Sequence, residues 1–316
     1  MSGWSLHFIA RKKGECRGDP DTSSDGRQVG VGVTVPYAVQ EWCRQNGHGD
    51  IARAEPVGGG CINQGLRLHT DRGKSLFLKV NPAAPEEMFA REAEGLRSLH
   101  QPDGPRLPAP YVWSRDFLLV EDLRPARRAS DYWSDLGHRL AALHEHRSSR
   151  FGFDHDNFIG STPQPNPWIE DGYDFFASHR LLFQARLARQ GGRLPASDAR
   201  RVEAIAGRLK DLVPAQPASL SHGDLWSGNV IVGPHGEACL IDPACHYGWA
   251  EAELGMTELF GGFDTAFYRA YAASRPLAPG WRDRLPLYNL YHLLNHLNLF
   301  GTGYLESVRR VLDRFA

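Results

Sequence analysis

The spacing of hydrophobic positions separates a first part of the chain rich in strands from a second part rich in helices. Helical spacing begins after Thr34, where Pro36 suits the first turn of a helix and Gly47 its end. Between residues 51 and 80 the period falls to two, which predicts a β-hairpin with a turn at Asp71–Lys74. The pattern then predicts a helix over residues 85–100 and strands over residues 111–114 and 117–121.

Helical spacing dominates from Ser130 onward and is interrupted once. The interruption lies between Leu220 and Asp242, where two apolar runs flank a turn at residues 233–236 and predict a second hairpin. The predicted helices of this part cover residues 131–146, 173–189, 197–213, 263–273, 281–300 and 304–315.

These patterns predict an α+β fold with two lobes. We expect a small β-rich lobe over residues 34–123 and a larger, mainly helical lobe over residues 124–316. Residues 1–33 combine clustered charge with few apolar positions, which is typical of a disordered tail or an over-long start. A chain of 316 residues with 41% hydrophobic content can bury one large core or two modest ones.

Composition argues against several classes of protein. The 36 basic and 37 acidic residues nearly cancel to a net charge of -1. The protein therefore has no overall positive electrostatic field that would attract a nucleic acid. No segment approaches the roughly 20 apolar residues of a membrane span, and the start lacks the apolar run of a signal peptide. We therefore expect a cytoplasmic protein without membrane contact. The five cysteines form no C-x-x-C pair, which argues against a zinc site or a disulfide framework.

The segment His222–Asn229 carries the H-x-D-x-x-x-x-N spacing of a phosphotransfer catalytic loop. In this spacing Asp224 would receive the proton of an attacking hydroxyl, while Asn229 would turn its amide oxygen toward Mg²⁺. Asp242, after the predicted hairpin, would supply the second metal ligand. Taken singly, Asp242 could be a turn former and Asn229 a cap. The three residues Asp224, Asn229 and Asp242 together favour catalysis. We expect His222 to hold the loop backbone.

Lys79 stands in the apolar run Leu76–Val80, where a charge on a half-buried face is costly unless it is paired. Glu92 on the following predicted helix is its natural partner. A lysine paired in this way anchors the α- and β-phosphates of ATP in kinases. The alternative is a surface lysine at a strand edge, which the sequence of this segment alone would favour.

A glycine-rich turn at the tip of the first hairpin precedes the Lys79 strand. It fits neither of the common phosphate-binding patterns, but glycines at this place let backbone N–H groups approach ATP. Its residues are Gly58, Gly59, Gly60 and Cys61. We further expect the main chain at Glu121 and Leu123, where the last strand of the first lobe ends, to meet the adenine.

Several segments resemble the fructosamine kinase (ketosamine kinase) family. They are HGDLWSGN from His222, IDPA from Ile241, MTELFGGF from Met256, YHLLNHLNLFG from Tyr291, DNFIGSTPQPN from Asp156 and GGGCINQG from Gly58. The resemblance implies an aminoglycoside-phosphotransferase-like, protein-kinase-like fold. It also implies ATP-dependent phosphorylation of the 3-hydroxyl of ketosamines, which are rearranged adducts of a sugar with an amine. The phosphorylated product then decomposes and releases the amine, which is a deglycation repair.

The same resemblance implies further site residues. Trp226 would form a wall of the sugar pocket, since an indole face stacks on a sugar and attracts an ammonium group. His296 would face the same pocket, with a satisfied interior histidine as the alternative. Glu251 and Glu253 would hold the amine end, although the family has Asp where this chain has Glu253. Cys61 matches a position that, in some members, forms an inter-subunit disulfide.

Two alternatives remain open on the sequence. The first is a small-molecule kinase with another acceptor, such as an aminoglycoside or choline. The second is a non-catalytic nucleotide-binding scaffold. The expected partner is a ketosamine, free or on a glycated lysine, and the chain is expected to be a monomer or a dimer linked by oxidation through Cys61.

Overall fold

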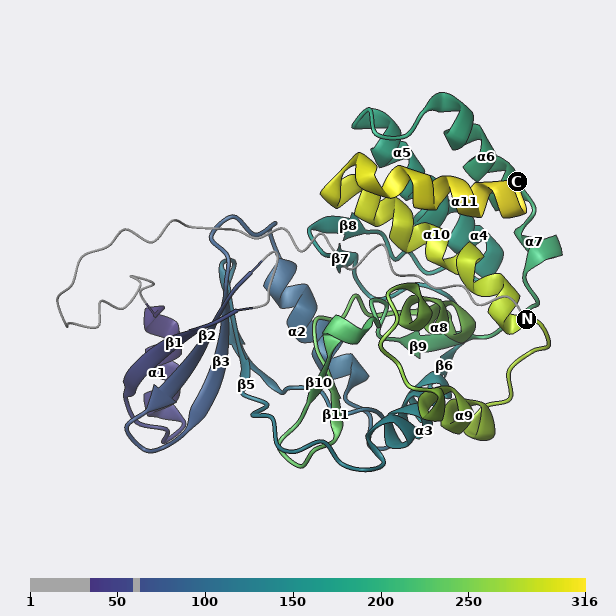
Figure 1. The fold of residues 1–316 in the computed structure, drawn as a ribbon. Coiled ribbons are helices and arrows are strands. Elements are labelled where there is room, and N and C mark those ends of the chain that lie inside the picture. The colour runs from purple at the N-terminus through teal and green to yellow at the C-terminus, as the bar shows by residue number, and fades with distance from the viewer. Residues whose placement is uncertain (1–34, 59–62) are drawn as a thin grey trace, which may run out of the picture. The chain divides into compact units, whose positions relative to one another are not determined.

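The computed structural model describes residues 35–58 and 63–316, and Pro36–Ala316 form one compact unit. Its N-terminal lobe is built on an antiparallel sheet of five strands (Figure 1). In spatial order the strands are β1 (Ile51–Val57), β2 (Gln64–Thr70), β3 (Ser75–Val80), β5 (Phe117–Glu121) and β4 (Pro110–Trp113). The predicted hairpin of residues 51–80 is therefore three consecutive strands, with the expected turn between β2 and β3.

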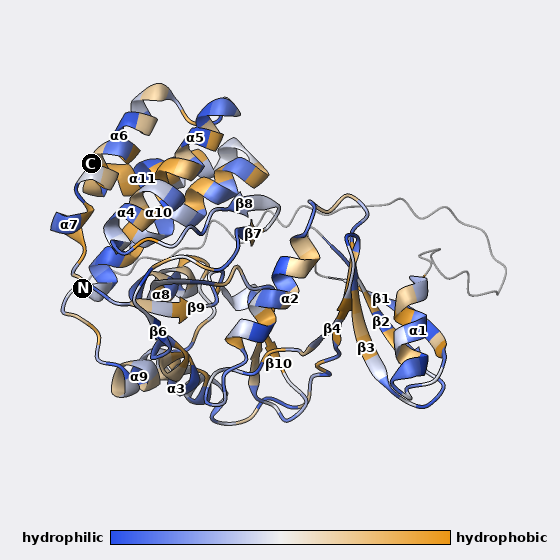
Figure 2. Ribbon diagram, turned by 180° about the vertical axis from the view of Figure 1, so that it is seen from behind, coloured by the Kyte–Doolittle hydropathy of each residue, from blue (hydrophilic) through white to orange (hydrophobic). Residues whose placement is uncertain are grey.

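Alternation along β3 explains how the sheet orients its lysine. Leu76, Leu78 and Val80 are buried on one face, so Lys79, between Leu78 and Val80, projects from the other. Helix α2 (Met88–Leu99) packs against β4 and β5 and lies between the sheet and the rest of this unit in both ribbon views (Figures 1 and 2). Helix α1 (Tyr37–Gln45) contacts β4.

The C-terminal lobe is mainly helical. Figure 2 shows apolar and polar residues mixed along α5, α6 and α11, as expected of helices with one buried side. Helix α10 contacts α5, α8 and α11, while α3 packs against α9. The elements are α3 (Tyr132–His144), α4 (Gly172–Phe176), a π-helical turn at Ala177–Leu181, α5 (Leu182–Gln190), α6 (Ala196–Gly207), α7 (Leu209–Leu212), α8 (Ala250–Leu259), α9 (Thr265–Ser274), α10 (Trp281–Phe300) and α11 (Leu305–Phe315).

Short strands in this lobe frame the segments that carry the candidate chemistry. Strand β9 ends directly before His222, and β10 starts directly after Asn229. Asp242 lies in the segment between β11, which ends at Leu240, and β12, which starts at His246. The strands are β6 (Arg147–Ser148), β7 (Asn157–Ile159), β8 (Thr162–Gln164), β9 (Ala218–Ser221), β10 (Val230–Val232), β11 (Ala238–Leu240) and β12 (His246–Trp249), with 3₁₀ turns at Ser227–Asn229 and Thr302–Tyr304.

The predicted hairpin between residues 220 and 242 is confirmed as the β10–β11 pair. The predicted helix of residues 173–189 contains the π-helical turn, and that of residues 197–213 is divided into α6 and α7. Helix α8 and the strands β6–β9 and β12 were not predicted. The α+β organisation is as expected, while the limits of the lobes at residues 34, 123 and 124 stay predictions, and residues 1–33 lie outside the described residues.

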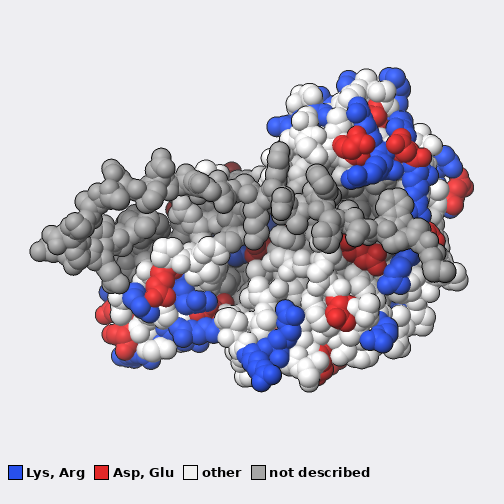
Figure 3. Space-filling view, in the orientation of Figure 1, with Lys and Arg blue, Asp and Glu red and all other residues white. Residues whose placement is uncertain are grey.

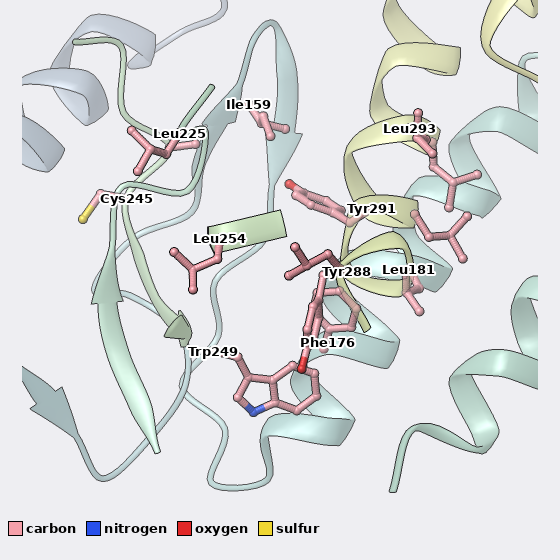
Figure 4. Packing of buried hydrophobic residues seen from close by; sticks show 14 of the residues in the cluster. Ile159, Phe176, Leu181, Leu225, Cys245, Trp249, Leu254, Tyr288, Tyr291 and Leu293 are labelled. Carbon is pink, nitrogen blue, oxygen red and sulfur yellow. The ribbon is translucent and has the colours of Figure 1, made fainter. Parts of the chain in front are cut away.

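One buried cluster runs through the C-terminal lobe and reaches α2 and β5. Figure 4 shows Leu225, Cys245 and Tyr291 within it, so the segments next to the candidate site rest on packed side chains. On the face seen in Figure 3, acidic and basic side chains are interspersed. No helix within residues 35–58 and 63–316 combines the length and apolar content needed to cross a membrane.

Candidate active site

The predicted catalytic loop, His222–Asn229, closes on itself through Asn229. The amide nitrogen of Asn229 donates to the main-chain oxygen of Asp224 at 2.8 Å and to its carboxylate Oδ2 at 3.2 Å. Because the nitrogen is used in this way, the amide Oδ1 is the atom that could face a cation. The 3₁₀ turn at Ser227–Asn229 brings the two side chains together across the loop.

Pairing of β10 with β11 brings Asn229 level with the segment before Asp242. The main-chain N–H of Ile241 donates to the carbonyl of Asn229 at 3.1 Å, one step beyond the Val230–Leu240 pair. Asp242 itself has a φ of 56°, in the left-handed region that a residue with a side chain rarely adopts. Such backbone is found where surrounding structure holds it for a function.

Lys79 joins the two lobes at this point. Its ammonium contacts both the carboxylate of Glu92 on α2 and the carboxylate of Asp242. Lys79 and Glu92 side chains are each 11% exposed, whereas that of Asp242 is 49% exposed and can reach a ligand. Burial alone would lower the pKa of Lys79, but the two carboxylates outweigh it and raise that pKa, so the lysine stays charged.

The carboxyl of Asp224 lies in an environment that raises its pKa, as a general base would require. Burial raises the pKa of Asp224 to about 7, the charge of Asp242 adds to the rise, and the hydrogen bond from Asn229 opposes it. A base works best when its pKa is near the working pH. Asp224 therefore can accept a proton at neutral pH, which its ordinary pKa would make unfavourable.

Gly223 allows the catalytic loop to lie against the segment after Asp242. Its φ is 84°, and an added Cβ would stand 2.1 Å from the carbonyl oxygen of Ala244. The N–H of Ala244 donates to the carbonyl of His222 at 2.8 Å. His222 also bonds the carbonyl of Ile241 through Nε2 at 2.9 Å, which agrees with the prediction that it holds the loop backbone.

Two oxygen-bearing side chains, Asn229 and Asp242, are the candidate ligands of a divalent cation. Within the described residues no group of three or more His, Cys, Asp or Glu could hold a metal by itself. A pair of oxygen ligands is what Mg²⁺ uses in nucleotide sites, where phosphates and water complete its shell. The donor set therefore fits Mg²⁺ delivered with a nucleotide.

Comparison of the sequence with models of known protein families identifies the family of this chain. The model of the fructosamine kinase family matches residues 36–316. The chain belongs to this family. A probable ketoamine kinase of Synechocystis sp. is 45% identical over 270 residues, which are 84% of this chain and 90% of the relative. A chloroplastic protein-ribulosamine 3-kinase of Oryza sativa subsp. indica is 36% identical over 98% of this chain and 92% of its own length.

Comparison with solved structures identifies the fold. A putative fructosamine-3-kinase of Thermobifida fusca superposes with a TM-score of 0.81 at 32% identity, covering 89% of this chain and 98% of that one. An aminoglycoside phosphotransferase superposes with a TM-score of 0.57 at 13% identity over 88% of this chain and 96% of its own. The fold is therefore the two-lobed, protein-kinase-like α+β fold, and this fructosamine kinase family member is a phosphotransferase that uses ATP.

The structure corrects the assignment of Glu251 and Glu253 to the substrate pocket of this kinase. Both are buried and already bound: Glu251 accepts from Arg284 Nε at 2.6 Å and from the hydroxyl of Tyr288 at 3.0 Å. Glu253 accepts from the N–H groups of His222 and Gly223 at 3.0 and 2.7 Å. Both carboxylates are thus already engaged by other groups of the protein, which leaves neither free to hold the amine end of a substrate.

The remaining predicted site residues of the kinase are those expected to contact ATP. Gly58 is exposed, while Gly59, Gly60 and Cys61 lie outside the described residues, so the glycine-rich turn stays a prediction. Glu121 turns its carboxylate to Arg106 at 2.5 and 2.6 Å, and Leu123 is buried. Their role next to adenine stays a prediction.

Trp226 and His296 belong to one aromatic group beside the catalytic loop of the kinase. The ring centroids of Trp226 and Phe260 are 5.9 Å apart, and those of Phe260 and His296 are 5.2 Å apart. A Cβ at Gly228 would stand 2.2 Å from the indole, so glycine lets the ring fold over the loop. The structure thus brings together the two residues that the sequence places 70 positions apart.

Sequence reasoning missed a buried amide network that supports this site. The side chain of Gln164 donates to the carbonyl of Ala244 at 3.0 Å, and that of Asn157 donates to the carbonyl of Cys245 at 2.7 Å. The hydroxyl of Tyr291 donates to Gln164 at 2.6 Å. The DNFIGSTPQPN segment was a signal for it, because Asn and Gln in a short hairpin suit carbonyl binding.

Proposed function

We propose that this kinase transfers the γ-phosphoryl group of ATP to the 3-hydroxyl of a ketosamine, and that the product decomposes and releases the amine. The observation that carries the proposal is the contact of Lys79 with both Glu92 and Asp242, next to the closed Asp224–Asn229 loop. The names of relatives, a ketoamine kinase and a protein-ribulosamine 3-kinase, support the choice of acceptor.

Binding of the nucleotide would depend on charged side chains that are already in position before ATP binds. The charged Lys79 would contact the α- and β-phosphates while Glu92 holds it in position. Asn229 and Asp242 would hold Mg²⁺, which would supply neutralisation of the charge on the phosphate oxygens. The main chain near Glu121 and Leu123 would meet adenine, and Gly58–Cys61 would cover the phosphates.

Asp224 would act on the acceptor. As the sugar oxygen forms its bond to the γ-phosphorus, the bond from that phosphorus to the β–γ bridging oxygen breaks, and the hydroxyl proton passes to the Asp224 carboxylate. A pKa of about 7 suits a group that holds the hydroxyl by a hydrogen bond and takes its proton late. Trp226 and His296 would line the sugar pocket.

Incubation with Mg²⁺, ATP and either ribulose-lysine or fructose-lysine tests the proposal, with the phosphate position read by NMR. We expect a 3-phosphate on at least one adduct. The same assay with an aminoglycoside and with choline serves as the comparison. Phosphorylation of one of these but of neither adduct would reject ketosamines as acceptors. No turnover on any acceptor, with Mg-ATP still raising the melting temperature, would indicate a scaffold.

Location and assembly belong to the same proposal. We expect a cytoplasmic enzyme, monomeric or linked as a dimer through Cys61, although the rice relative is named chloroplastic. Non-reducing gels after mild oxidation of the wild type and of Cys61→Ser would decide the second point. A wild type without any thiol-dependent dimer would end that idea.

A further inference from the structure

An aromatic row begins at the catalytic loop and reaches the surface at the end of α10. After Trp226, Phe260 and His296, the next ring is Phe300, whose centroid is 5.4 Å from that of His296. Tyr304 flanks the row, with its centroid 5.1 Å from His296 and 6.2 Å from Phe300. Three segments distant in sequence therefore contribute to one aromatic surface.

Both ends of this row are in contact with solvent. Three large hydrophobic side chains are exposed in the described part of the chain: Trp226 at 37%, Phe300 at 54% and Tyr37 at 71%. Single exposed aromatics are ordinary on protein surfaces. Here, however, two of the three belong to one row that starts beside the reacting group, which is typical of a ligand-binding surface.

The row is longer than one sugar. The main chain of Trp226 lies next to Asp224, since its backbone N–H donates to the main-chain carbonyl of Asp224 at 3.2 Å. From there the successive centroid distances through Phe260 and His296 to Phe300 lie between 5.2 and 5.9 Å. A sugar stacked on Trp226 is about as wide as one ring, so the rest of an acceptor that follows the row would pass Phe260 and His296 toward Phe300.

The chemistry of the row suits an ammonium group with an apolar substituent. Aromatic faces attract cations and also remove apolar surface from water. Burial lowers the pKa of His296, so this imidazole is neutral near pH 7 and does not repel a positive charge. A ketosamine carries a secondary ammonium between its sugar and the substituent of the original amine.

We propose that the row is an outer acceptor subsite in which Phe300 contacts the substituent on the amine nitrogen of the ketosamine and favours an apolar or aromatic one. The inference rests on the proposed function, because it requires that Asp224 receives the sugar hydroxyl. Phe300 then sets which amines are preferred without taking part in phosphoryl transfer.

The experiment compares two acceptors that differ in this substituent, the fructose adducts of benzylamine and of methylamine. In Phe300→Ala, KM for the benzylamine adduct rises about fivefold to tenfold, the size expected for loss of one aromatic contact. KM for the methylamine adduct and kcat for both stay within about twofold of the wild type. Phe300→Tyr keeps the ring and retains the preference. Tyr37→Ala removes an even more exposed ring, from α1, and changes neither KM.

Equal effects of Phe300→Ala on both adducts, or no effect on either while the wild type phosphorylates both, would overturn the subsite and leave the proposed function intact. A wild type that phosphorylates neither adduct nor the lysine adducts overturns the proposed function, and the subsite with it.

Discussion

Lys79 and Asp242 are 163 residues apart in the sequence, yet the ammonium of the first contacts the carboxylate of the second. Lys79 comes from β3, and Asp242 follows β11 of the other lobe. Glu92 on α2 is the third member of the group. One cation therefore ties together a sheet, a helix and the hairpin that follows the catalytic loop, and its loss has consequences for both activity and stability.

Lys79→Met removes the charge while keeping an apolar stem of similar length. We expect kcat/KM for ATP to fall by about 100-fold or more, since the phosphates lose their anchoring cation. We also expect about 3 kcal/mol lower stability, because Glu92 remains buried without its partner. Steady-state kinetics and urea unfolding measure the two effects.

A second substitution separates those effects. In Lys79→Met with Glu92→Leu, stability returns toward that of the wild type, because the unpaired buried carboxylate is gone, while activity stays low. Lys74→Met, at the β2–β3 turn, is the matched control and leaves both unchanged. Recovery of activity in the double variant would contradict an anchoring role for Lys79.

Asp224→Asn tests the proposed base. We expect affinity for Mg-ATP to remain near that of the wild type and turnover to fall by orders of magnitude, because the amide cannot take the hydroxyl proton. Nucleotide titration and a single-turnover assay measure the two quantities. Asp211→Asn, on the exposed end of α7, is the control. Full turnover in Asp224→Asn would reject the assignment.

Gly223→Ala and Gly73→Ala form a matched pair. Both glycines have positive φ, 84° and 78°, so each substitution costs about 1 kcal/mol of backbone strain. Nothing lies within 4 Å of a Cβ at Gly73, whereas one at Gly223 would meet the carbonyl of Ala244 at 2.1 Å. We therefore expect Gly73→Ala to keep its activity and Gly223→Ala to lose it. Equal activities, measured at saturating substrate, would show that the loop tolerates displacement.

The spacing of hydrophobic residues predicted those elements of the fold that depend mainly on nearby residues. The hairpin between Asn229 and Asp242 has two short apolar runs around a Gly-containing turn, and α10 was predicted with its observed bounds, Trp281–Phe300. Lys79 and Glu92 were paired correctly because a charge on an apolar strand needs a partner. The hairpin and the helix needed only neighbouring residues, whereas the Lys79–Glu92 pair also depended on the catalytic-loop spacing at His222–Asn229.

Helix α8 shows what the sequence could not reveal. Its acidic residues Glu251 and Glu253 are buried, so the helix has no polar face and gives no amphipathic signal. Their partners are distant in sequence: Arg284 follows Glu251 by 33 positions, and His144 precedes Glu253 by 109. From the sequence the two carboxylates appeared free to bind an amine, because partners at that distance can be known only from the fold.

The last prediction concerns Glu253 and acid. Burial alone would raise the pKa of Glu253, but the hydrogen bond and electrostatic attraction of His144, with smaller contributions from His222 and from the N–H of Gly223, lower it to about 2 from an ordinary value of 4.5. The folded state thus favours the ionised form. The stabilisation is complete above about pH 4.5 and is lost as the pH falls toward 2.

Glu253→Gln keeps the shape of the side chain but removes this charge beneath the catalytic loop. We expect it to lower the free energy of unfolding by about 2–3 kcal/mol at pH 7, and the difference from the wild type to shrink as the pH falls from 4.5 to 3. Urea unfolding at a series of pH values measures the difference, and Glu306→Gln on α11 provides an exposed control. Because Glu253 accepts from the N–H groups of His222 and Gly223, the variant also lowers kcat. A difference that stays constant with pH would show that the carboxylate acts through its shape and not its charge.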